Sequence, residues 1–110
     1  MNRKNYNKLI RDKIPEIIKK NGAIPKISEL NDEKFRIALK EKLLEEAQEL
    51  AEAKTGDEIL NELSDVMQLI ESIALNNNLS VSEVEKQKEK KKQECGGFEK
   101  KLFLEYVDEP

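Results

Sequence analysis

Two pairs of acidic residues at helical spacing offer the clearest chemistry in this sequence. Glu46 and Glu49 stand three residues apart in EKLLEEAQELAEA, and Glu62 and Asp65 stand three apart in ILNELSDVMQL. Residues three apart on a helix project from the same side, one turn from each other. Carboxylate oxygens are the ligands that hard cations such as Mg²⁺ and Mn²⁺ prefer. The spacing therefore points to a divalent cation held by two helices.

The apolar pattern of both segments places these acids beside a buried face. With Leu43 as reference, Glu46 lies about 60° away, inside the apolar arc of its helix. With Leu63 as reference, Glu62 lies about 100° away, at the edge of the second arc. A buried carboxylate is costly unless it is paired or binds a metal. We therefore expect a metal ion, and not a lysine, to be the partner of Glu46.

The turn between the two segments brings the acidic pairs to the same height. Thr55-Gly56-Asp57 reads as a tight connection between antiparallel helices, and both acidic pairs lie equally far from it along the chain. Glu46 should then lie level with Asp65, and Glu49 with Glu62. Four converging carboxylates repel one another at a partly dry site, which favours a bound cation.

Cap signals predict the helices that must position these acids. We expect an all-α fold, built on a hairpin of two long helices with shorter helices before and after it. The first expected helix spans residues 15–20, and the second runs from residue 31 or 32 to about 54, where Gly56 ends it. The third spans about 58–75 and has Asp57 as its cap. The fourth is opened by a capping box of Ser80 and Glu83. The apolar tail FEKKLFLEYV should be extended or a single strand. We expect residues 1–110 to form one domain.

Composition excludes several classes of site. The 110 residues include no histidine and one cysteine, so histidine catalysis, histidine-based zinc sites and an internal disulfide are excluded. The net charge is −3 with both signs mixed, which argues against a nucleic-acid polymer or a membrane surface as partner. No apolar run is long enough to span a membrane, and the lone Cys95 suits a reducing compartment, so we expect a cytoplasmic protein.

Three stretches of this chain carry a family resemblance. The pattern EExxE at 45–49, followed by ExxD at 62–65, resembles the MazG-like group of all-α NTP pyrophosphohydrolases. That superfamily includes dimeric dUTPases and phosphoribosyl-ATP pyrophosphohydrolase. YNKLIRDKIPEII at 6–18 and GGFEKKLFLE at 96–105 resemble the terminal signatures of a branch of small MazG-like proteins.

The resemblance implies an activity and roles for the acids. The activity is Mg²⁺-dependent cleavage of a (d)NTP or related nucleotide between the α- and β-phosphates, giving a nucleoside monophosphate and pyrophosphate as a housekeeping reaction. Glu46, Glu49, Glu62 and Asp65 would be the metal ligands, with Mn²⁺ as a possible substitute for Mg²⁺. Glu45 would be the base that activates water.

Four basic residues are candidates for binding the phosphates. Lys8, Arg11 and Lys13 lie in the N-terminal signature, where their alternative role is to pair with neighbouring acids. Lys42 lies one turn before Glu46, so it would either approach a phosphate or neutralise Glu46 as an i,i+4 partner.

Two further interpretations and one assembly follow from the same residues. Cys95 stands where the resemblance implies a basic residue, so the alternative is a non-enzymatic helical module that binds a nucleotide or a protein. The third interpretation is plain helical dimerisation with solvated acids. In each case one hairpin leaves an apolar face uncovered, so we expect a homo-oligomer, a dimer or tetramer that completes a four-helix core.

Overall fold

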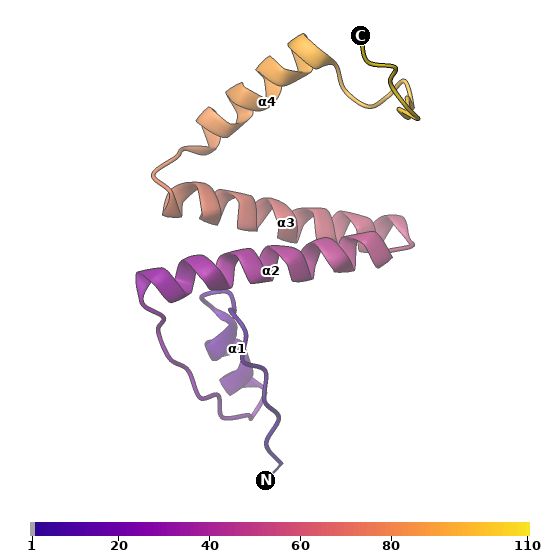
Figure 1. Ribbon diagram of the computed structural model, residues 1–110. Helices are drawn as coiled ribbons and strands as arrows, with labels where there is room; N and C mark the ends of the chain where they lie inside the picture. The colour runs from indigo at the N-terminus through magenta and orange to yellow at the C-terminus, as the bar shows by residue number, and fades with distance from the viewer. Residues whose placement is uncertain (1) are drawn as a thin grey trace.

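The computed structural model describes residues 2–110, and this part of the chain forms four helices and no strand. The helices are α1 (Ile14–Lys20), α2 (Asp32–Glu52), α3 (Gly56–Asn76) and α4 (Val81–Cys95). The prediction of an all-helical fold is confirmed. The two long helices α2 and α3 run antiparallel, side by side, with α1 and α4 on opposite sides of this hairpin in the view of Figure 1.

Side-chain caps begin three of these helices. The side chain of Asn31 accepts a hydrogen bond from the backbone N–H of Lys34 at 2.9 Å and so starts α2. Ser80 and Glu83 form the predicted capping box of α4, with reciprocal bonds of 3.1 and 2.8 Å. These bonds satisfy N–H groups that have no partner within the helix.

The start of α3 differs from the prediction by two residues. Thr55, and not Asp57, caps the helix, because its Oγ1 accepts a hydrogen bond from the Glu58 N–H at 3.1 Å. Gly56 is the first residue of α3 and not a terminator of α2, which ends at Glu52 and is followed by Ala53 in an extended conformation. Asp57 falls in the first turn instead, where a negative charge is favoured by the helix dipole.

The core of the described chain is small. Its buried apolar side chains are Leu39 on α2 and Leu69 and Ala74 on α3. α3 packs against both α2 and α4, whereas α1 does not pack closely on any other helix. The radius of gyration is 18.9 Å, whereas a compact domain of this length has about 13 Å. Residues 101–110 form neither helix nor strand. None of the helices between residues 2 and 110 is both long and apolar enough to cross a membrane.

Candidate metal centre

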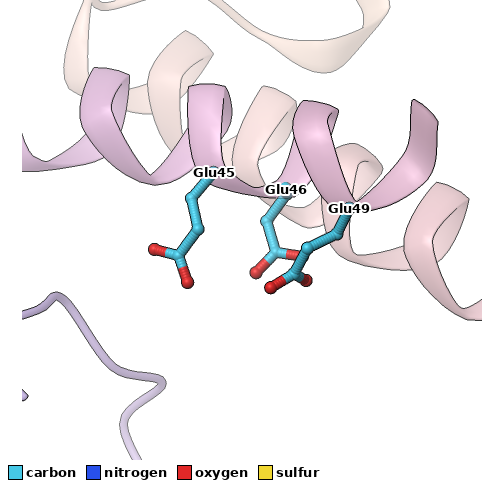
Figure 2. Close-up of side chains that lie close together, drawn as sticks. All are labelled: Glu45, Glu46 and Glu49. Carbon is cyan, nitrogen blue, oxygen red and sulfur yellow. The ribbon is translucent and has the colours of Figure 1, made fainter. Parts of the chain in front are cut away.

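Carboxylates from α2 and α3 gather around Glu46. Oxygens of Glu46, Glu62 and Asp65 all lie within 4.8 Å of one another, and the same holds for Glu45, Glu46 and Glu49. Figure 2 shows the three acids of α2 with their side chains directed to the same side of the helix. Because Glu46 belongs to both groups, the structure brings together all five acids that the sequence singled out.

Glu46 is buried because of its place on α2. It lies seven residues, or two turns, after the buried Leu39, so both side chains face α3. Only 7% of Glu46 is exposed, and no other charged or polar residue in the described chain is buried. On α3 the corresponding pair is Glu62, seven residues before the buried Leu69. Each helix thus presents one acid and one leucine on the face that it packs against the other.

Two carboxylate oxygens in this interface lack a hydrogen-bond donor. Glu46 Oε2 and Glu62 Oε2 are both buried, and within residues 2–110 neither receives a hydrogen bond. The other oxygen of Glu46 lies 3.5 Å from Lys42 Nζ, which also lies 3.4 Å from Glu45 Oε1. Of the two roles predicted for Lys42, pairing with Glu46 as an i,i+4 partner is thus confirmed, and the expectation that Glu46 has a metal and not a lysine as its partner does not hold for Oε1. A proton, a further cation or a buried water is needed to satisfy the two unpartnered oxygens.

The pKa values follow from this crowding. A hydrogen bond shared with Glu46, then burial and the charges of Glu49, Glu46 and Asp65, raise the pKa of Glu62 to about 7. The hydrogen bond with Glu46 is also the main reason that the pKa of Glu49 is raised. For Glu46, burial pushes the pKa up, but hydrogen bonds from Glu62 and Glu49 and the charge of Lys42 outweigh it and lower the pKa.

These shifts make Glu62 the acid of the cluster that takes up a proton most readily near neutral pH, while the pKa of Glu46 is lowered. Glu62 influences the pKa of both Glu46 and Glu49, so it lies close to both of these acids of α2. A proton and a divalent cation are alternative ways to offset the same repulsion, and all the available donors are carboxylate oxygens, which suit a hard cation.

The predicted phosphate-binding residues are placed unequally. Arg11 Nη2 donates to Asp65 Oδ1 at 2.7 Å, across 54 positions of sequence. Lys8 instead lies over the ring of Tyr6, with Nζ 5.6 Å from the ring centroid. Lys13 precedes α1 and forms no ion pair within the described residues. Together with Lys42, Arg11 is thus one of two predicted basic residues in contact with the acids.

A cavity of about 560 Å³ adjoins the cluster at the turn of the hairpin. Glu49 and Glu62 line it together with residues that the sequence reasoning did not single out: Glu52, Ala53, Asp57, Glu58 and Asn61. The signal was present in the sequence. Glu52 stands three residues after Glu49, and Glu58 four before Glu62, so both continue the acidic rows toward the turn.

Comparison with known proteins finds a partial relative. No family model matches the chain, and no solved structure matches it. An uncharacterized protein of Mycolicibacterium smegmatis (strain ATCC 700084 / mc(2)155) is 46% identical over 52 residues, which are 47% of this chain and 53% of the relative. The chain thus spans about half the length of the curated relative that it matches, and the name of that relative assigns no activity.

Proposed function

We propose that this protein is a Mg²⁺-dependent nucleotide pyrophosphohydrolase. It would cleave a (d)NTP or a related nucleotide between the α- and β-phosphates and release a nucleoside monophosphate and pyrophosphate. The observation that carries the proposal is the pair of buried, unpartnered oxygens of Glu46 and Glu62 at the contact of α2 and α3. The resemblance of residues 6–18, 45–65 and 96–105 to MazG-like proteins supports the same activity.

The acidic residues fit a hard divalent cation. Glu46, Glu49, Glu62 and Asp65 would hold Mg²⁺, or Mn²⁺ in its place, since they supply only oxygen donors within a few ångströms of one another. The ion would supply the positive charge that offsets both these acids and the phosphates of a nucleotide. Without such charge, a cluster of this kind would repel a triphosphate.

Residues around the cluster supply the remaining groups for hydrolysis. Glu45 has a side chain that is 40% exposed beside the buried Glu46, so it can take the proton of an attacking water as a general base. Arg11 and Lys42 place positive charge next to the acids, where each can donate to phosphate oxygens. Lys8 and Lys13 belong to the same segment as Arg11 and would extend this phosphate-binding surface.

We also propose that two or more copies assemble to complete the core. The chain exposes 10576 Å², whereas a compact monomer of this mass exposes about 6,200 Å². Much of the excess is apolar, and on α3 it includes Leu60, Leu63 and Met67, which line one groove. A stable homodimer buries roughly 2,000–5,000 Å² of mostly apolar surface, which this excess can provide. A dimer or tetramer in the cytoplasm, where the exposed Cys95 stays reduced, fits these features.

A product assay tests the activity. The protein is incubated with each NTP and dNTP plus Mg²⁺, and pyrophosphate and nucleoside monophosphate are both measured. Changing even outer-shell partners of a metal costs 10- to 100-fold, so Glu46→Gln and Glu62→Gln should lower turnover by at least about 100-fold. Glu89→Gln, at an exposed position of α4, is the matched control and should keep full activity.

The other outcomes distinguish the alternatives. Release of inorganic phosphate and a nucleoside diphosphate would contradict the proposed bond cleavage. Nucleotide binding without turnover would favour the non-enzymatic module. An absence of both, in a protein that is still dimeric by light scattering, would leave helical dimerisation as the function.

A further inference from the structure

Arg11 contacts the acidic cluster from a distant part of the chain. Its Nη2 donates to Asp65 Oδ1 at 2.7 Å, the length of a charge-assisted hydrogen bond. The Asp65 side chain is 29% exposed and that of Arg11 is 56% exposed. A carboxylate has two oxygens, and an oxygen of Asp65 lies within 4.8 Å of oxygens of Glu46 and Glu62, so Asp65 can accept this bond while it stays part of the acidic cluster.

This contact is also the link between the N-terminal segment and the hairpin. Within the described chain, no other hydrogen bond or ion pair joins residues 2–30 to residues 31–110. α1 does not pack closely against α2, α3 or α4. The Arg11–Asp65 pair is therefore the one polar contact, within the described residues, that ties the N-terminal segment to the acidic cluster.

We propose that Arg11 is a positioning residue for the metal centre, which orients Asp65 and couples docking of the N-terminal segment to cation binding. This inference rests on the metal site of the proposed function. Acidic metal ligands are commonly oriented by an outer hydrogen-bond donor, and removal of that donor weakens metal affinity. Because coupling between two equilibria is reciprocal, a cation that binds better when Arg11 is docked also holds the segment more firmly in place.

The coupling has a consequence for substrate binding. Lys8 and Lys13 flank Arg11 within the same short stretch, so docking of Arg11 on Asp65 holds the segment that carries both lysines beside the hairpin, although neither lysine contacts the acids. The positive charge of Arg11 opposes a dication, but it lies on a side chain that is more than half exposed and is screened by water. Orientation of Asp65 is the larger effect, so Arg11 raises the affinity for the cation.

Metal affinity in the full chain tests the inference. Binding of Mn²⁺ and Mg²⁺ is measured by calorimetry for the wild type, Arg11→Ala, Arg11→Lys and Arg3→Ala. Arg11→Ala should weaken binding by roughly 10- to 100-fold, and Arg11→Lys should recover most of that loss because lysine can still donate to Oδ1. Arg3→Ala removes an exposed arginine of the same segment and should bind like the wild type.

Hydrogen exchange supplies a reading that a purely structural role would not change. Mg²⁺ should slow amide exchange over residues 2–20 in the wild type and in Arg3→Ala, but not in Arg11→Ala. Thermal unfolding should be nearly unchanged in Arg11→Ala, since an exposed ion pair adds little stability.

The results separate this inference from the proposed function. If the wild type binds the cation, Glu46→Gln does not, and Arg11→Ala binds equally or more tightly, the role of Arg11 is refuted while the metal site stands. If the wild type binds neither cation, the metal site itself is refuted, and the role of Arg11 falls with it.

Discussion

Replacing Glu46 with glutamine should stabilise the protein while it removes cation binding. Glu46 is 7% exposed, and its Oε2 has no donor within the described residues. A buried polar group without a partner costs about 1–3 kcal/mol. Glutamine removes the negative charge and can place an amide N–H donor where Oε2 lies, next to the unpartnered Glu62 Oε2. The substitution also weakens the contact with Lys42 at 3.5 Å, and an i,i+4 ion pair on a helix contributes only about 0.3–0.5 kcal/mol. The relief is the larger effect, so we expect a gain of about 0.5–2.7 kcal/mol.

Urea unfolding at pH 7.5 measures this gain. The wild type, Glu46→Gln and the exposed control Glu89→Gln are compared in EDTA at one fixed protein concentration, because the stability of an oligomer depends on concentration. Added Mg²⁺ should then stabilise the wild type and the control but not Glu46→Gln. If Glu46→Gln unfolds at lower urea than the wild type in EDTA, the carboxylate is not a source of strain and the reasoning is wrong.

Two further substitutions test the electrostatics and the caps. Because the pKa of Glu62 is raised to about 7, a proton must leave before a cation binds, so the affinity should fall about tenfold per pH unit below 7 in a calorimetric titration. In the folded protein the pKa of Glu62 lies above its ordinary value of 4.5. Between pH 4.5 and about 7 the folded state therefore binds more protons than the unfolded state, so the free energy of unfolding should fall as the pH rises through this range. Glu62→Gln should flatten the pH dependence of both metal affinity and stability, and unchanged profiles would contradict the assignment. Ser80→Ala removes the cap of α4 and should cost about 0.5–2 kcal/mol, seen as lower urea stability and lower helical circular dichroism, whereas no loss would show that α4 does not contribute to cooperative folding.

Local signals predicted the helices well where the capping chemistry was unambiguous. The capping box of Ser80 and Glu83 formed as its spacing indicates, because both partners lie within one turn. At the hairpin turn the sequence predicted Asp57 as the cap, but Thr55 takes that position, and both residue types are good caps. The backbone after Glu52 decided between them, since an extended Ala53 brings Thr55 to the helix start.

The helical wheel found the acids but misplaced the centre of the packed face of α3. The apolar face of α3, centred on Leu63, is wide enough to pack against two different partners. Its Leu69 side packs on α2 and carries Glu62, while Leu63 is 46% exposed and Met67 63% exposed. A helical-wheel projection indicates which side chains form the apolar face, but it does not indicate which neighbouring element packs against each part of that face.

The contact between Arg11 and Asp65 had no local signal. Arg11 and Asp65 are 54 residues apart, and the course of an irregular N-terminal segment brings them together. Hydrophobic periodicity does not predict the course of such a segment. The sequence suggested nearby acids as the alternative partners of the N-terminal cations. The structure pairs Arg11 instead with a residue of the candidate metal centre.

The short link of residues 53–55 acts as a spacer that sets the phase of the two long helices. Because this link is short and extended, a residue added to or removed from it would shift the start of α3 relative to α2, which would move Glu62 and Asp65 out of line with Glu46. Length changes should therefore be tolerated poorly here and far better in the connection of residues 21–31, which carries no such alignment. Insertions or deletions in residues 53–55, which contribute no ligand to the site, would thus impair the metal centre as much as substitution of the acids.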